Sequence, residues 1–149
     1  MRKAFFEAFC REQSFLLYDD VGFGVIDQSH PRVINVGIAE QAMVGMAAGM
    51  ASEGARVYCY AIAPHFIRAW EFARNMVAGT GRDVTLVGVG VGDDYKALGK
   101  THAITSQEIS LLCHAIGLPY YCPFDRGSLG DALAQRAPKF LHLGKARMD

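Results

Sequence analysis

The fold is decided by the segment Arg32-Val33-Ile34-Asn35-Val36-Gly37-Ile38-Ala39-Glu40-Gln41-Ala42-Met43-Val44-Gly45-Met46-Ala47-Ala48-Gly49. Its first part, 33–36, is a short apolar run closed by Gly37, which is typical of a buried strand. Its second part begins a helix over 39–53 that is rich in Ala, Gly and Met, and Gly54 is the natural C-cap of that helix. A short apolar strand that leads directly into a helix is a unit of a parallel α/β sheet.

The rest of the chain repeats this alternation of helices and short apolar strands. The spacing of apolar residues predicts helices at 2–13, 39–53, 66–78, 106–116 and near 128–137, and strands at 15–18, 33–36, 57–62, 84–89, 120–122 and 140–143. Such a pattern indicates a mostly parallel sheet of about six strands with helices on both faces. We therefore expect an α/β fold, as a single three-layer domain over 1–149.

Composition excludes several classes of protein. The chain has 149 residues, 51% of them hydrophobic, and this length suits one domain with a sizeable core. It has 15 basic and 15 acidic residues, a balance that argues against a general nucleic-acid or membrane-surface binder. No apolar run approaches the roughly 18 residues of a membrane span, and charges interrupt any signal-peptide core, so we expect a cytoplasmic protein. The four cysteines form no Cys-x-x-Cys pair, and we expect no metal site built from this chain alone.

The carboxyl edge of the predicted sheet is where a ligand is expected. In open parallel sheets, ligands bind outside the carboxyl ends of the strands. The segments that follow the predicted strands there are Asp19-Asp20, 37–40, 88–102 and 123–125.

The helix over 39–53 carries one carboxylate that does not suit its composition. It has no polar face before Ser52-Glu53, and a helix that is apolar all round is buried. Its small residues let another backbone come close, so we expect it to pack against a second subunit. Yet Glu40 lies in its first turn, and a buried, unpaired carboxylate costs several kcal/mol. Glu40 is either a functional, hydrogen-bonded carboxyl group or an N-terminal residue that favours the helix dipole by roughly 0.3–1 kcal/mol. Composition alone leaves both interpretations open.

The segment 32–49 resembles the signature of the pyrimidine-binding domain of the transketolase family, and weaker similarity extends over most of the chain. The resemblance implies a thiamine diphosphate-dependent transferase that catalyses two-carbon (ketol) transfer. It implies that Glu40 hydrogen-bonds N1′ of the aminopyrimidine ring and activates the cofactor. It also implies that His102, in the segment Thr101-His102-Ala103-Ile104, reaches the reacting oxygen of the substrate.

Two departures from the family pattern affect the expected site. Alignment on Arg68-Ala69 puts Ile62 and His65 where many members have aromatic residues that pack on the pyrimidine, and Phe66 is the nearest aromatic residue. Ile62, His65 and Phe66 are therefore the expected cofactor-binding residues beside Glu40. Leu98 stands where classical transketolases have an acidic residue tied to sugar-hydroxyl recognition, so the donor substrate is expected to differ.

The sequence has no Gly-Asp-Gly…Asn motif, which in this family binds the diphosphate through a divalent cation. The resemblance therefore implies a split enzyme, active only with a separate diphosphate-binding subunit that carries this motif and holds Mg²⁺. Self-association through the helix over 39–53 is also expected, which would give a heterotetramer.

Two alternatives stay open at this point. One is a beta-type subunit of a 2-oxo acid decarboxylase or dehydrogenase, whose substrates lack sugar hydroxyls, and Leu98 makes this interpretation less remote. The other is a non-catalytic binding or regulatory module of the same fold.

Overall fold

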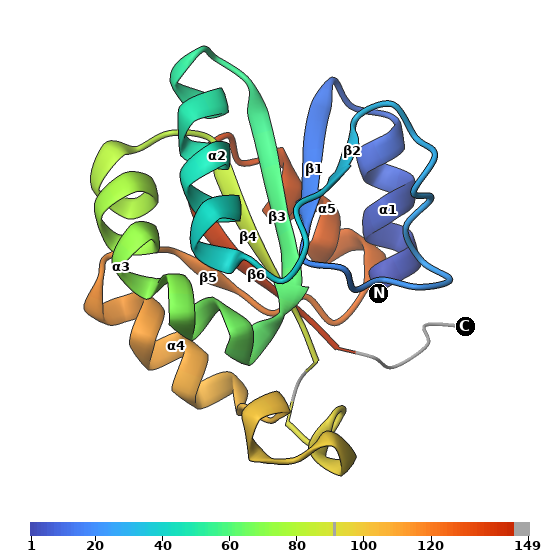
Figure 1. The fold of residues 1–149 in the computed structure, drawn as a ribbon, viewed down its shortest axis with the longest axis vertical. Helices are drawn as coiled ribbons and strands as arrows, with labels where there is room; N and C mark the ends of the chain where they lie inside the picture. The colour runs from blue at the N-terminus through green and yellow to red at the C-terminus, as the bar shows by residue number, and fades with distance from the viewer. Residues whose placement is uncertain (91, 145–149) are drawn as a thin grey trace.

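A six-stranded, wholly parallel sheet forms the centre of the protein (Figure 1). The computed structural model describes residues 1–90 and 92–144. The sheet has the strand order β2-β1-β3-β4-β6-β5. The strands are β1 (Ser14–Tyr18), β2 (Val33–Asn35), β3 (Arg56–Ile62), β4 (Val84–Val89), β5 (Tyr120–Tyr121) and β6 (Lys139–Leu143). The predicted α/β class and parallel sheet are therefore confirmed.

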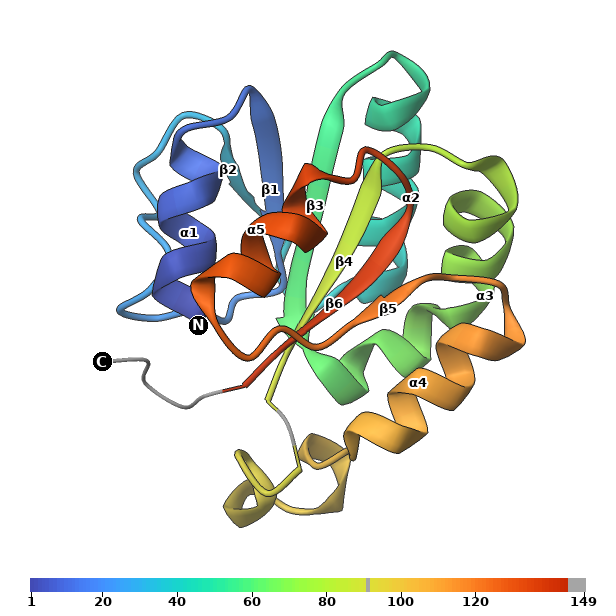
Figure 2. The same ribbon diagram turned by 180° about the vertical axis from the view of Figure 1, so that it is seen from behind.

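Helices cover both faces of the sheet, which makes three layers. The α-helices are α1 (Arg2–Cys10), α2 (Glu40–Ser52), the single turn α3 (Trp70–Phe72), α4 (Ser106–Ala115) and α5 (Arg126–Ala134). Figure 1 shows α2, α3 and α4 in front of the sheet, and Figure 2 shows α1 and α5 in front of its other face. The 3-10 helices η4 (Lys96–Leu98) and η5 (Lys100–His102) lie in the connection after β4. None of the helices in the described residues is long and apolar enough to cross a membrane.

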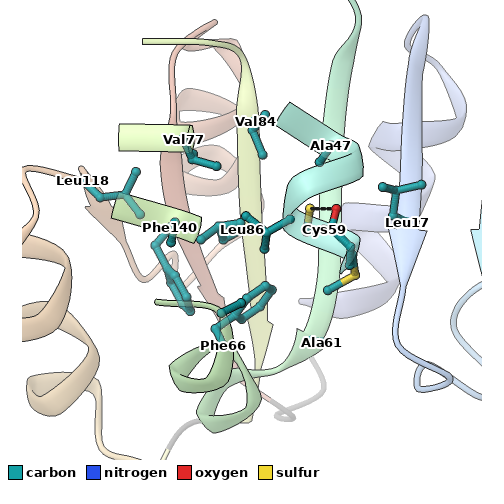
Figure 3. Close-up of a cluster of buried hydrophobic side chains, with 14 of the residues drawn as sticks. Leu17, Ala47, Cys59, Ala61, Phe66, Val77, Val84, Leu86, Leu118 and Phe140 are labelled. Atoms are coloured by element: carbon teal, nitrogen blue, oxygen red, sulfur yellow. Dashed lines mark hydrogen bonds between the residues drawn. The ribbon is translucent and has the colours of Figure 1, made fainter. Parts of the chain in front are cut away.

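The larger hydrophobic core lies between the sheet and the helices on the face that α2 covers (Figure 3). Alternate strand residues such as Cys59, Ala61 and Leu86 point into it, while their neighbours Tyr58 and Tyr60 pack with α1 and α5 on the other face. This alternation follows from the two-residue period of a strand. Both faces of β3 and β4 are buried, which is why these strands are mostly apolar, with Arg56 and Thr85 as the buried polar exceptions.

The predicted helix at 66–78 is wrong in its start and in its regularity. The helical segment begins directly after β3 as the 3-10 helix η1 (Ala63–Ala69), with Pro64 in its first turn, where a missing N–H is tolerated. It continues through α3 into a π-helical stretch, η2 (Ala73–Val77), and a short 3-10 turn, η3 (Ala78–Thr80). The early start brings residues 63–68 to the carboxyl edge of the sheet.

A buried polar network lies at the amino edge of the sheet, away from the expected ligand site. The Arg56 guanidinium pairs with the Glu12 carboxylate at 3.1 Å and with the Asp83 carboxylate at 3.7 Å. The ammonium of Lys139, which is 1% exposed, donates to the carbonyls of Gln135 and Ala137. Burial lowers the pKa of Lys139 from 10.5 to about 8. This lysine therefore couples the free energy of unfolding to pH.

We expect Lys139→Met to remove one component of the pH dependence of stability. The unfolded lysine binds a proton that the folded one releases above about pH 8, so its contribution to the free energy of unfolding rises with pH. Between about pH 7 and about pH 9.5 that rise is about 2 kcal/mol. Burial raises the pKa of the Cys59 and Cys113 thiols, which oppose the rise, so the quantity to measure is wild type minus variant in urea unfolding. A difference that stays constant with pH would contradict this assignment.

Candidate active site

Four connections meet at the carboxyl edge of the sheet and bring the candidate residues together. Asp19 directly follows β1, and Glu40 is the first residue of α2, after β2. His65 lies in η1 after β3, and His102 ends η5 in the connection after β4. Val91 of the predicted 88–102 loop lies outside the described residues. The predicted edge is thus where the polar side chains gather.

Hydrogen bonds in the turns after β1 and β2 place the start of α2 at this edge. Asp20 has φ 63°, a left-handed conformation that Asp tolerates, and its carboxylate accepts a hydrogen bond from the Asn35 amide at 3.0 Å. Gly37 has φ 68°, and its N–H donates to the Asn35 side chain at 2.8 Å. Gly37 is needed here because a Cβ disfavours this conformation. Because Asn35 is hydrogen-bonded to both Asp20 and Gly37, the two turns are held together, and Asp19 and Glu40 lie on neighbouring connections.

Glu40 is buried and its two oxygens have different environments. Its side chain is 4% exposed. Arg68 donates from Nη1 to Oε1 at 2.9 Å, and His65 Nδ1 lies 3.4 Å from the same oxygen. The other oxygen, Oε2, has no hydrogen-bond partner among the described residues, and it is not one of their fully buried unpartnered atoms. One oxygen is therefore held in place while the other is open to a ligand.

His65 links Glu40 to a second buried carboxylate. Its Nδ1 lies 3.3 Å from Asp19 Oδ2, and the Asp19 side chain is fully buried. Burial raises the pKa of Asp19, and the hydrogen bond from His65 opposes this rise. Within the described part of the chain, Asp19 Oδ1 has no hydrogen-bond partner. Asp19, His65 and Glu40 form what we call the edge cluster.

The edge cluster also has the geometry of a metal-ligand group. One ligand atom from each of Asp19, Glu40 and His65 lies within 4.8 Å of the other two, and all three residues are buried. From the sequence, no metal site is expected in this chain alone. No motif indicates the group, because its members come from three separate connections.

His102 lies next to the edge cluster. Its ring centroid is 5.2 Å from that of His65, in an edge-to-face arrangement. Its Nδ1 lies 2.9 Å from the Thr101 hydroxyl. The side chain of Leu98, in the same connection, is 59% exposed. The structure thus brings together Glu40, His65 and His102, three of the five predicted site residues.

Phe66 and Ile62 lie in the hydrophobic cores instead. Phe66 is completely buried and packs edge-to-face on Phe140, with a ring-centroid distance of 5.5 Å (Figure 3). Successive residues of a 3-10 helix point about a third of a turn apart, so His65 faces the edge while Phe66 faces the core. Ile62 is 7% exposed and belongs to the core on the α1 and α5 side.

Two members of this site are not among the residues predicted from the sequence. Asp19 stands out there only as one of several acidic residues at the edge, and Arg68 only as an alignment point. The available signals were the position of Asp19 directly after an apolar strand and the three-residue step from His65 to Arg68, which puts both side chains on one face of a 3-10 helix. Neither signal identifies a partner, because that depends on where other connections end.

Three curated relatives are similar to parts of the chain. A putative transketolase C-terminal section from Methanocaldococcus jannaschii is 43% identical over 68 residues, which is 42% of this chain and 22% of the relative. One of the subunits of an apulose-4-phosphate transketolase from Actinobacillus succinogenes is 42% identical over 72 residues, which is 48% of this chain and 23% of the relative. A 6-deoxy-6-sulfo-D-fructose transketolase subunit, SqwH, from a Clostridium species is 30% identical over 117 residues, 75% and 36%. The matched segments span about a fifth to a third of the lengths of these relatives.

Solved structures share the fold. A split-gene transketolase, described as an inactive beta4 tetramer, superposes with a TM-score of 0.77 at 22% identity, over 99% of this chain and 50% of that one. A transketolase from Campylobacter jejuni gives a TM-score of 0.81 at 17% identity, over 99% and 26%. The sequence model of the family "Transketolase, pyrimidine binding domain" matches residues 6–139. The chain therefore belongs to the family of transketolase pyrimidine-binding domains.

Proposed function

We propose that the chain supplies the pyrimidine-binding half of a split transketolase-type active site. The observation that carries the proposal is the state of Glu40, a buried carboxylate with Oε1 held by Arg68 and Oε2 open. An aminopyrimidine ring presents a ring nitrogen that can share a proton with such an oxygen, so the residues fit thiamine diphosphate. When bound, this cofactor supplies the carbon nucleophile for two-carbon (ketol) transfer.

Each residue of the site then has a distinct task. Glu40 holds and lends a proton at Oε2, which is the work of a general acid–base group. Arg68 keeps the carboxylate oriented through Oε1. The ring of His65 forms the wall beside the pyrimidine, because Phe66 has no surface outside the core. His102, beside His65, reaches the reacting oxygen of the substrate.

A partner subunit completes this site. We infer that a separate chain binds the diphosphate and its Mg²⁺ through a Gly-Asp-Gly…Asn motif, which the residues of this sequence do not contain. Two relatives whose names include "subunit" and one named a "C-terminal section" support a divided enzyme. The solved beta4 tetramer, described as inactive, supports the inference that such a half assembles without being active alone.

The decisive experiment measures cofactor binding by calorimetry with and without a diphosphate-binding partner. We expect thiamine diphosphate with Mg²⁺ to bind weakly or not at all to this chain alone, because the sequence has no Gly-Asp-Gly…Asn motif to hold the cation that the diphosphate needs. Tight, Mg²⁺-dependent binding should appear with the partner. Tight, Mg²⁺-dependent binding to the chain alone would sink the split-enzyme proposal.

A second candidate function is a beta-type subunit of a 2-oxo acid decarboxylase or dehydrogenase. Leu98 favours it, because an exposed leucine cannot accept hydrogen bonds from sugar hydroxyls. Turnover of ketose phosphates and of 2-oxo acids by the same reconstituted complex separates the two. If the complex turns over only 2-oxo acids, the second candidate function is correct and ketol transfer is not the reaction.

A further inference from the structure

His65 lies between two buried carboxylates and shares one ring nitrogen with both. Its Nδ1 is 3.3 Å from Asp19 Oδ2 and 3.4 Å from Glu40 Oε1. Ionised carboxylates only accept hydrogen bonds, so the proton of this contact lies on Nδ1. The side chain of His65 is 11% exposed, and its Nε2 has no partner among the described residues without being one of their fully buried atoms. Water therefore reaches Nε2 while Nδ1 faces the carboxylates.

Asp19 is the second carboxylate of this arrangement, and it is buried without a full set of hydrogen bonds. Its side chain is fully buried, Oδ1 has no hydrogen-bond partner in the described residues, and Oδ2 has His65 as its partner. An incompletely paired buried carboxylate is costly, and such groups are retained mainly where they act on a neighbour. The neighbour it can act on is the imidazole that also contacts Glu40.

We propose that Asp19, His65 and Glu40 share protons as one unit, and that His65 is a positioning residue that passes a proton to and from Glu40. The proposal rests on the proposed function of Glu40 and adds control of its charge, because a proton bound at Oε1 neutralises the carboxylate whose Oε2 is open to the ligand. The carboxylate can regain a proton inside the edge cluster without direct contact with bulk water.

The transfer balances within the edge cluster. The Nδ1–H bond of the imidazolium breaks and an O–H bond forms at Glu40 Oε1, which turns the imidazolium into a neutral ring and the carboxylate into an acid. This imidazolium forms beforehand, when the neutral ring with its proton on Nδ1 takes up a proton from water at the bare Nε2, so after the transfer the ring keeps a proton on Nε2 alone. The starting state is restored by the reverse path, in which Nδ1 takes the proton back from Oε1 and Nε2 releases one to water. Arg68 donates to Oε1 throughout, and Asp19 compensates the charge of the imidazolium. The groups that face His65 are Asp19 from the end of β1, Glu40 from α2 and His102 from η5.

The position of the proton can be measured by ¹⁵N NMR on the full chain without cofactor. We expect the neutral ring of His65 to carry its proton on Nδ1. His142 is an internal control with the opposite tautomer, because its Nε2 contacts the Gly90 carbonyl at 2.6 Å and its Nδ1 faces the Tyr120 hydroxyl at 2.9 Å. Burial lowers the pKa of His142, which keeps that control neutral. A neutral His65 protonated on Nε2 would overturn the proposal.

Proton sharing is tested by following the carboxyl carbons of Asp19 and Glu40 by ¹³C NMR across pH. In wild type we expect a titration step common to both carbons and the His65 ring, since coupled groups titrate together. His65→Asn keeps an N–H donor near the position of Nδ1 but cannot pass a proton, so the common step should disappear. No common step in wild type, or one that persists in His65→Asn, would contradict the proposal.

A second variant covers the case in which His65→Asn does not fold. Asp19→Asn keeps an acceptor for Nδ1 and removes one titrating group, so the step shared by His65 and Glu40 should move to a different pH. An unmoved step would also contradict the proposal. These measurements use neither cofactor nor partner, so their outcome is separate from that of the proposed function.

Discussion

Glu40→Gln should lower the rate of C2–H/D exchange of thiamine diphosphate in the reconstituted complex by about 10²–10⁴-fold. Glutamine preserves the size of the side chain and an oxygen that can accept the hydrogen bond from Arg68, so α2 and the edge of the sheet should fold unchanged. What is lost is the titratable proton. Cofactor binding, measured in parallel, should change only by a modest factor. NMR of the exchanging C2 proton gives the rate.

The matched control for this variant is Glu53→Gln. Glu53 is the exposed C-cap of the same helix and undergoes the same chemical change far from the edge cluster. Its exchange rate should equal that of wild type. Should Glu40→Gln also match wild type and lose only a few tenths of a kcal/mol of stability, Glu40 would be a helix-dipole residue and the enzymatic proposal would lose its main support.

Gly45→Glu should abolish self-association of the chain or cause it to aggregate. In the single chain, α2 packs its inner side on the sheet and exposes an outer stripe that includes Ala42, Met46 (45% exposed) and Gly49. Ile38 before the helix is 71% exposed. The stripe has no charged side chain, and we propose that it is the self-association surface of a heterotetramer. The sequence predicts that the whole helix is buried. In the single chain only its inner side is buried.

The size of this effect follows from burying an unpaired charge. A Cβ on Gly45 would meet only Phe72 ring atoms at 3.6 Å, an ordinary contact, so the folded subunit tolerates the new side chain. An unpaired carboxylate in an apolar interface costs several kcal/mol, which weakens association by about 100-fold or more. Light scattering across a dilution series measures the change.

Gly130→Glu is the matched control for this second variant. Gly130 lies on the exposed side of α5, on the opposite face of the sheet, and a Cβ there would meet nothing within 4 Å. The control should associate as wild type does. If Gly45→Glu likewise remains an unchanged, soluble species, the interface lies elsewhere on the chain.

Local sequence patterns predicted the strands well and the helix ends less well. The strand predicted at 84–89 coincides with β4. The strand predicted at 57–62 differs from β3 only in its first residue, because β3 begins one residue earlier, at Arg56. Apolar runs mark buried strands directly. The helix predicted at 2–13 ends at Cys10 instead, where the Arg32 side chain bonds the carbonyls of Cys10, Glu12 and Ser14. The helix predicted near 128–137 begins at Arg126, because Asp125 forms a capping box with Ser128.

The identity of the family could be read along the chain, and the same segment singled out Glu40 as the candidate catalytic residue. The strand, the glycine turn and the Ala-, Gly- and Met-rich helix are contiguous, and a carboxylate in that setting is unusual wherever the helix packs. The same pattern placed His102 at the correct edge, because carboxyl ends of parallel strands share one side of a sheet.

Which side chains meet was decided only by the tertiary structure. Asp19, Glu40 and His65 belong to connections that follow three different strands, and the strand order places β1 between β2 and β3. That order, together with the early start of η1, turns His65 toward two carboxylates and Phe66 into the core. The physical reason is that contacts between connections depend on strand order and helix phase, which are set by packing of the whole core and not by any one segment.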